Sequence, residues 1–310
     1  MKIIDFHTNA TAVAENTVVA LGFFDGVHAG HRHLLKTAIE EAKKRGLASL
    51  VLTFSEEGSA GLKSDSKRIF SEKTRLDVFE ELGVEYAVLL KYEKVKEMSH
   101  TEFVRDVIVG FCRAELAVCG FNFRYGEGAL GNAQTLYAQM SEFGFDCIVE
   151  EPYLYEGAPI SSSRIRECVA NGDIKRASDM LGECFSVTSE ILHGKALGRV
   201  LGIPTANQSF PPNMALPRFG VYATRVRIDG KMYNAVTNIG MRPTVDDGEF
   251  VNCESHIIDY DGDLYGKVIR IDFYEMIREE KKFSSLDELR TQIEKDRKEA
   301  EQWLITFGQN

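Results

Sequence analysis

Short apolar runs alternate with stretches of helical periodicity along the first part of the chain. The runs with the length and composition of buried strands are 18–24, 48–54, 86–92, 114–120 and 146–152. The stretch 31–45 is expected to be a helix, and one of its faces would carry Leu34, Leu35, Ala38, Ile39 and Ala42. Strands and helices that alternate along a chain usually form parallel strands joined by right-handed crossover connections. Residues 1–182 are therefore expected to form a Rossmann-like α/β domain around a parallel sheet.

After residue 182 the pattern changes to alternating apolar and polar residues. The runs expected as strands are 185–193, 220–228, 231–240, 252–260 and 266–276. Asp229-Gly230 and Asp261-Gly262 lie between such runs and predict two tight hairpins. Residues 183–310 are therefore expected to form an all-β domain, a small antiparallel barrel. The last helix begins with a capping box, Ser285 and Glu288, and is expected to cover one opening of the barrel.

Composition and charge narrow the class of protein. With 310 residues and 44% apolar content, the chain can form two buried cores. The excess of 47 acidic over 37 basic residues, a net charge of -10, argues against a nucleic-acid partner. The first apolar run stops at Asp25, too short for a membrane span, so a cytoplasmic enzyme is expected. The six cysteines lack zinc spacing and are expected to be reduced; the oligomeric state is left open.

A histidine motif follows the first predicted strand. His28, Gly30 and His31 form H-x-G-H where that strand should turn into a helix. Gly26 and Gly30 let a ligand approach the backbone, and a helix N-terminus offers free N–H groups to anions. Imidazoles at this place could stabilise a polyphosphate during in-line attack on the α-phosphorus of ATP. The alternative is that these histidines only begin a helix.

A run of serines lies at another predicted helix start. Ser162 and Ser163 are followed by Arg164 and Arg166 in the first turn, where positive charge opposes the helix dipole. Cations at that end of a helix indicate an anion, so Ser162, Ser163 and Arg166 are candidates for a phosphate clamp. The alternative is a serine cap followed by solvated arginines.

The second domain has a candidate site of its own. Lys195, Gly198 and Gly202 lie in a glycine-spaced stretch that could approach phosphate, although it is not a Walker A motif. Thr205 and Asn207 follow, and strand alternation would point both to one side. Neutral oxygen ligands of this kind suit Mg²⁺ bound to ATP. The alternative is an ordinary glycine and proline turn before a strand.

Glu254 lies within an apolar strand run, where an uncompensated charge would be costly. A carboxylate at such a position could accept the proton of a substrate hydroxyl as a general base. Glu254 is therefore the candidate catalytic base of the second domain.

Two sets of motifs resemble one family. "LGFFDGVHAGHRHLL", "GFNFRYGEGALGN" and "ISSSRIR" look like the adenylyltransferase module of prokaryotic bifunctional riboflavin kinase/FAD synthetases. "GRVLGIPTAN", "GVYATRV", "NIGMRPTV" and "CESHIIDYDGDLYG" look like the riboflavin kinase module of the same family. The resemblance implies a nucleotidyltransferase domain over 1–182 and, over 183–310, a six-stranded barrel with a C-terminal helix.

The resemblance also implies roles for single residues. His28, His31, Ser162, Ser163 and Arg166 would contact ATP phosphates, and Asn122 would lie on the flavin side. Thr205 and Asn207 would bind Mg²⁺ and ATP phosphates, and Glu254 would activate the terminal ribityl hydroxyl. Riboflavin plus ATP would give FMN, and FMN plus ATP would give FAD.

The chain departs from the family pattern at two places. Ser55–Gly58 stands where many members continue with an acidic residue and Pro-His-Pro, and Ala129 stands where an arginine is frequent. Two alternatives to full bifunctionality stay open, and the first of them rests on these departures. One is a riboflavin kinase with a weakened or inactive adenylyltransferase domain, and the other is a regulatory protein that binds flavin or nucleotide.

Overall fold

The computed structural model describes residues 1–8, 11–57, 67–192, 203–243 and 249–307. The chain divides into two compact units, Met1–Ser162 and Ser163–Asn310, and each is described by itself. No helix within the described residues is long and apolar enough to cross a membrane.

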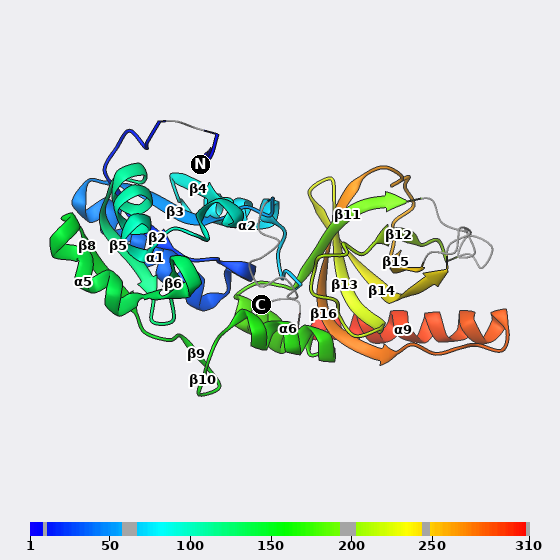
Figure 1. The fold of residues 1–310 in the computed structure, drawn as a ribbon. Coiled ribbons are helices and arrows are strands. Elements are labelled where there is room, and N and C mark those ends of the chain that lie inside the picture. Colours follow the sequence, from blue (N-terminus) through cyan, green and yellow to red (C-terminus); the bar gives the residue numbers. More distant parts are fainter. Residues whose placement is uncertain (9–10, 58–66, 193–202, 244–248, 308–310) are drawn as a thin grey trace. The chain divides into compact units, whose positions relative to one another are not determined.

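A six-stranded parallel sheet forms the centre of the first unit (Figure 1). Its order is β1 (Lys2–Asp5), β4 (Tyr86–Leu90), β3 (Ala48–Phe54), β2 (Thr17–Leu21), β5 (Ala114–Gly120) and β8 (Asp146–Glu150). The parallel sheet and all five predicted strands are confirmed. The sequence pattern missed β1, because only Ile4 of this short edge strand is buried.

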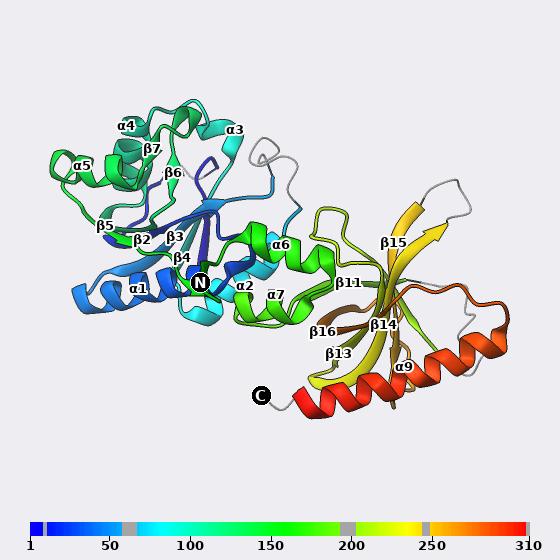
Figure 2. The same cartoon turned by 90° about the horizontal axis from the view of Figure 1, so that it is seen from below.

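Helices cover both faces of this sheet (Figure 2). α1 (Ala29–Arg45) and α2 (Glu72–Leu82) lie on one face, and α4 (His100–Glu102) and α5 (Ala133–Phe143) lie on the other. α1 buries Leu34, Leu35, Ala38 and Ala42 as predicted, while Ile39 is half-buried. The remaining elements are a 3₁₀ turn (Asp25–Val27), α3 (Tyr92–Val95), a π-helical segment (Phe103–Phe111), β6 (Arg124–Tyr125), a 3₁₀ turn (Glu127–Ala129), β7 (Gly131–Asn132), β9 (Leu154–Tyr155) and β10 (Ala158–Pro159).

The strand order reverses between β2 and β5. From β2 the chain adds β3 and then β4 on one side, and it returns to place β5 on the other side of β2. The carboxyl ends of β2 and β5 therefore flank a topological switch point, the place where open α/β sheets bind their ligands.

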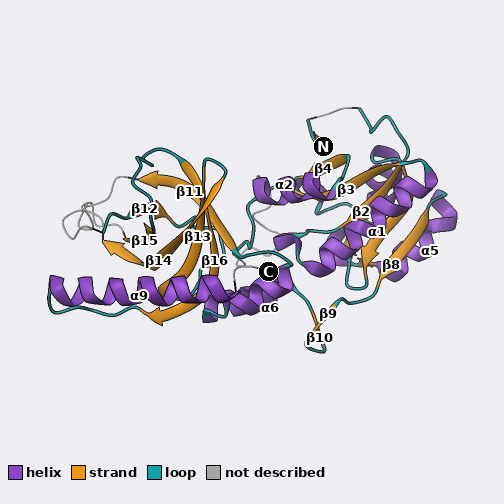
Figure 3. Cartoon of the chain, turned by 180° about the vertical axis from the view of Figure 1, so that it is seen from behind, coloured by secondary structure: helices purple, strands orange, loops and turns teal. Residues whose placement is uncertain are grey.

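The second unit contains a closed six-stranded antiparallel barrel (Figure 3, where all strands are orange). Around the barrel the strands are β11 (Ser186–Leu192), β12 (Ala206–Ser209), β15 (Glu249–Ile257), β14 (Lys231–Pro243), β13 (Gly220–Ile228) and β16 (Val268–Glu279). Among the described residues of this unit the helices are α6 (Ser162–Asn171), which begins at the division, α7 (Ile174–Leu181) and α9 (Leu286–Phe307). The predicted barrel with a C-terminal helix is confirmed.

One of the two predicted hairpins forms. Asp229 and Gly230 have φ of 48° and 81° and connect Ile228 to its pairing partner Lys231. The hairpin predicted at Asp261-Gly262 is wrong, because β15 pairs with β12 and β14 while β16 pairs with β11 and β13. The Asp-Gly signal here belongs to a loop that joins two strands apart in the barrel.

Alternate residues of the barrel strands face its interior. Thr224, Thr237 and Ser255 are buried inside and form two hydroxyl contacts of 2.8 Å each. The opposite face of the same strands lies outside, where Val221 and Ala223 pack against Leu304 of α9. The expectation that this helix covers an opening is therefore wrong, because α9 packs along the outer wall.

The helices before the barrel pack against it. α7 contacts β16, and the backbone N–H of Arg218 donates to the Val169 carbonyl at 3.3 Å. The compact unit thus begins before the change in strand pattern at residue 182. The boundary between two functional domains at 182/183 stays a prediction.

Candidate active sites

The backbone between β2 and α1 is strained. Phe24, Gly26 and Val27 have positive φ of 54°, 77° and 38°, and Val27 is fully buried. Positive φ is a rare conformation for a β-branched residue, and it persists only where the surroundings impose it. A Cβ on Gly26 would lie 3.0 Å from the Ile69 side chain. This turn is therefore held in one conformation at the switch point.

Asp25 anchors the turn. Its buried carboxylate accepts a hydrogen bond from the Ile69 N–H at 2.9 Å. Its backbone carbonyl accepts one from the Ser162 hydroxyl at 3.0 Å. The first predicted clamp serine is thus joined to the histidine loop within the first unit. Ser163 and Arg166 belong to the second unit, where the Arg166 guanidinium donates to the Ser163 hydroxyl at 3.3 Å.

His28 is the N-cap of α1. Its Nδ1 accepts a hydrogen bond from the His31 N–H at 3.2 Å, so the neutral ring carries its proton on Nε2. Burial lowers the pKa of His28 to about 4, well below the ordinary value of 6.5. At neutral pH this side chain is therefore an uncharged donor at the start of a helix.

His31 stacks on His28. The ring centroids are 3.5 Å apart at an angle of 15°, and Phe24 contacts the His31 ring edge to face at 5.2 Å. A Cβ on Gly30 would lie 3.4 Å from the His28 ring, so glycine leaves room for the stacked pair. Both predicted histidines are brought together beyond the carboxyl end of β2.

Asn122 follows β5, the other strand at the switch point, and is exposed. The turn that carries it is closed by a 2.9 Å hydrogen bond from the Phe123 N–H to the Gly120 carbonyl. Further along this segment Ala129 has a φ of 57°, a conformation that favours glycine. The Asn122 segment therefore extends from the same edge of the sheet as the histidines.

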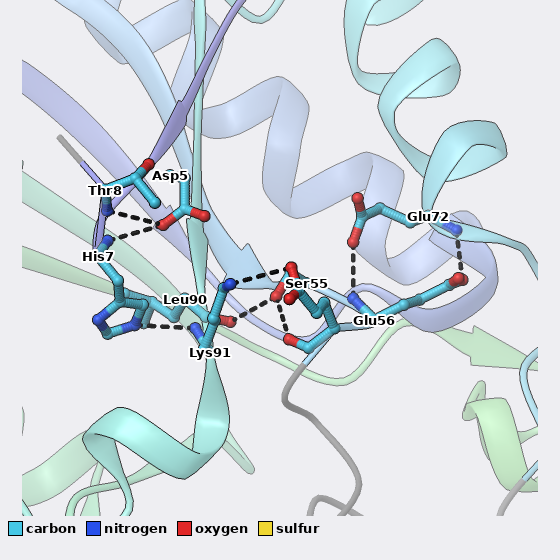
Figure 4. Close-up of polar contacts among 9 residues, drawn as sticks. Asp5, His7, Thr8, Ser55, Glu56, Glu72, Leu90 and Lys91 are labelled. Carbon is cyan, nitrogen blue, oxygen red and sulfur yellow. Dashed lines mark hydrogen bonds and ion pairs between the residues drawn. The ribbon is translucent and has the colours of Figure 1, made fainter.

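Backbone and side-chain contacts fix the segment Ser55–Glu57, which follows β3 (Figure 4). The Ser55 N–H donates to the Leu90 carbonyl at 2.9 Å, and the Lys91 ammonium pairs with Glu57 at 2.9 Å. Glu56 and Glu72 each accept a hydrogen bond of 2.6 Å from the backbone N–H of the other. Gly58 lies outside the described residues. The altered segment is thus tied to β4 and to the start of α2.

Arg75 of α2 was missed by sequence reasoning. It is 3% exposed, and its guanidinium donates to the carbonyls of Phe23 at 2.8 Å and Phe54 at 2.9 Å. It therefore ties together the chain segments that leave β2 and β3. The sequence spacing of Arg75 from Val78 and Phe79 could have predicted its burial, because the three residues share one helix face and the other two are buried.

The predicted kinase residues meet on the outer face of the barrel. Asn207 on β12 pairs with Glu254 on β15. The Thr205 hydroxyl donates to the Glu254 carboxylate at 2.6 Å. Asn207 is 8% exposed, and Thr205 and Glu254 are half-buried. Two neutral oxygen-bearing side chains therefore lie on one side, as the alternation predicted, and the register between β12 and β15 places the Glu254 carboxylate beside them. Lys195, Gly198 and Gly202 lie outside the described residues.

Asn252 was also missed. It lies two residues before Glu254 on the same face of β15, and its amide Nδ2 donates to Asn207 Oδ1 at 3.0 Å. Nothing in the sequence indicated that this asparagine, at the first position of the predicted strand, contacts Asn207. The contact depends on the register between β12 and β15.

Comparisons with known proteins match both units. A family model described as FAD synthetase matches residues 10–164, and one described as riboflavin kinase matches residues 181–304. A Bacillus subtilis protein named bifunctional riboflavin kinase/FMN adenylyltransferase is 35% identical over 92% of this chain and 91% of its own length. An Escherichia coli protein of the same name is 34% identical over 96% of each chain.

A solved structure extends the likeness to the fold of the whole chain. The crystal structure of a protein named macrolide-efflux protein from Streptococcus pneumoniae has a TM-score of 0.88 and 30% identity. The match covers 98% of this chain and all of that one. With both family models matched and relatives aligned over nearly their full length, the chain belongs to the family of bifunctional riboflavin kinases/FMN adenylyltransferases.

Proposed function

We propose that the two units perform two successive reactions at the sites described above. The barrel unit transfers the γ-phosphoryl group of ATP to riboflavin and forms FMN, and the α/β unit transfers AMP from a second ATP to FMN and forms FAD. The observation that carries the proposal is the presence of both chemistries in one chain: a stacked histidine pair at a switch point and a carboxylate beside two neutral oxygen-bearing side chains.

In the kinase reaction Glu254 is the proposed base. The Thr205 hydroxyl already donates to its carboxylate, so the site presents an oxygen that accepts hydrogen bonds from hydroxyl groups. The terminal ribityl hydroxyl would give its proton to Glu254 as its oxygen forms a bond to the γ-phosphorus, and ADP would leave. The oxygens of Thr205 and Asn207 fit Mg²⁺, which supplies charge neutralisation of the polyphosphate when bound.

In the adenylyl transfer a phosphate oxygen of FMN attacks the α-phosphorus of ATP, and pyrophosphate leaves. No protein nucleophile is needed. His28 would donate from Nε2 to a phosphate oxygen, because its Nδ1 is occupied by the helix cap. His31, Ser162, Ser163 and Arg166 are proposed as further phosphate ligands, and Asn122 as a flavin-side residue. A cytoplasmic location is proposed because both steps consume ATP.

The test is a product analysis with paired variants. Purified protein is incubated with riboflavin, ATP and Mg²⁺, and the flavins are separated by chromatography. FMN followed by FAD is expected. Glu254→Gln should stop FMN formation but still convert supplied FMN to FAD, and His31→Ala should accumulate FMN. A crossed result, with Glu254→Gln blocking only FAD formation, would reverse the assignment of the two sites.

One observation favours a second candidate. The Ser55–Glu57 segment is fixed to β4 and α2 by its own hydrogen bonds, at an edge of the sheet next to the ATP site. A kinase with weak adenylyltransferase activity would give FMN with little FAD in the same assay. A regulatory binder would give neither product.

A further inference from the structure

Asn252 belongs to the proposed kinase site by its position on β15. It and Glu254 lie two residues apart and on the same outer face. Asn207 pairs directly with Glu254, and Ser209 pairs with Asn252, so Asn207 is the diagonal neighbour of Asn252. The two asparagines are 7% and 8% exposed. Their contact is therefore a buried amide pair beside the proposed base.

The direction of the hydrogen bond matters. Asn252 Nδ2 donates to Asn207 Oδ1 at 3.0 Å. A side-chain amide has an oxygen at one end and an NH₂ group at the other, and only the oxygen can bind a cation. In this arrangement Asn252 presents its NH₂ group, so the end of the Asn207 amide that faces Asn252 is the oxygen.

The opposite strand provides no side chain to pair with Asn252. Its pairing partner on β14 is Gly240, which offers no side chain. The space where a Cβ of Gly240 would lie is taken by the Glu280 carboxylate. The Asn252 side chain can therefore extend toward β12 and contact Asn207.

We infer that Asn252 is a positioning residue of the kinase, which orients the Asn207 side-chain oxygen toward the magnesium ion of the bound nucleotide. The inference rests on the proposed function of this face of the barrel. Groups that orient a metal ligand affect metal affinity by about 10 to 100-fold when they are removed. Loss of Asn252 therefore weakens the dependence of nucleotide binding on Mg²⁺, without removing a group that touches the riboflavin hydroxyl.

The test measures binding as well as activity. ADP is used as the probe, because the kinase reaction forms it and the adenylyl transfer does not. Calorimetry gives its affinity for the full chain with and without Mg²⁺. In Asn252→Leu, which keeps the size but removes the donor, the gain in ADP affinity on adding Mg²⁺ should fall at least about tenfold. Conversion of FMN to FAD by the same protein should stay unchanged.

A double-mutant cycle separates orientation from a merely structural role. In an Asn207→Asp background both ends of the side chain are oxygens, so Asn252→Leu should cause little further loss. An equal loss in both backgrounds would refute the inference, as would a Mg²⁺ gain in Asn252→Leu within twofold of the unchanged chain. Asn252→Ala, which also removes the donor, serves if the leucine variant unfolds at low temperature.

Failure of the proposed function gives a different result. If the unchanged chain forms no FMN while Asn252→Leu still loses its Mg²⁺-dependent ADP affinity, the positioning role stands and the kinase assignment fails. If the unchanged chain forms FMN but its ADP affinity does not respond to Mg²⁺, the positioning role fails and the kinase assignment stands.

Discussion

At the scale of single residues, His28 joins the fold of the first unit to its proposed chemistry. The same ring caps α1 through Nδ1 and presents Nε2 as a donor. Since the cap uses one nitrogen, any change that protonates the ring also breaks the cap. The low pKa of His28, about 4, keeps both functions intact at neutral pH.

This coupling predicts a loss of stability in acid. The folded chain resists protonation of His28 until about pH 4, whereas the unfolded chain takes up the proton near pH 6.5. Stability from this group is therefore complete above about pH 6.5 and is lost as the pH falls toward 4. Between pH 7.5 and 4.5 the loss should be about 2 to 3 kcal/mol.

The measurement is the free energy of urea unfolding at both pH values. His28→Asn keeps a good capping side chain but has no titrating group, so its loss between the two pH values should be smaller by that amount. An equal loss in both proteins would rule out His28 as the source.

The candidate residues could be predicted from sequence where local spacing decides their place. H-x-G-H put His28 and His31 at a helix start because the cap is a local contact. Thr205 and Asn207 were expected on one side because alternation is local too. Asn252 and Arg75 were missed, because their contacts depend on strand register and on packing between distant segments.

At the scale of elements, α9 shows what sequence periodicity can and cannot give. The helix and its start were predicted, but its docking place was not. Its position on the outer wall depends on which face of β13 carries Val221 and Ala223. The failed Asp261-Gly262 hairpin has a similar cause, since barrel closure decides which strands pair.

A buried ion pair attaches α9 to the barrel. The Arg278 guanidinium of β16 binds the Asp296 carboxylate at 2.7 Å, and the Asp296 side chain is 2% exposed. Gln292 also donates to Asp296 at 2.8 Å. Asp296→Ala would leave a partly buried guanidinium unpaired, so the barrel unit should lose about 3 to 5 kcal/mol.

Urea unfolding followed by tryptophan fluorescence checks this, because Trp303, the single tryptophan, lies on α9 itself. The matched control is Lys281→Ala, which breaks the exposed pair with Glu288 and should cost less than about 1 kcal/mol. Similar losses in both variants would contradict a special role for the buried pair.

At the scale of the whole molecule, two sites of different chemistry share one substrate, ATP. They release different products from it, ADP in the kinase step and pyrophosphate in the adenylyl transfer. The amounts of ADP and pyrophosphate released therefore measure the activity of each site separately in the intact chain.

Starting from riboflavin, each FAD formed should be accompanied by one ADP and one pyrophosphate. Supplied with riboflavin and FMN together, Glu254→Gln should release pyrophosphate without ADP, because only the adenylyl transfer remains. Coupled assays for the two products give both ratios. Stoichiometric ADP from Glu254→Gln would mean that another residue acts as the kinase base.

The alternation of β15 has a consequence for how this protein can evolve. Cys253 and Ser255 line the barrel interior, while Asn252 and Glu254 face outward beside Asn207. Selection on core volume and selection on phosphoryl transfer therefore act on interleaved positions of one strand. Substitutions among the interior residues need not change the residues on the outer face that take part in phosphoryl transfer. Stability and catalysis can therefore change independently during evolution.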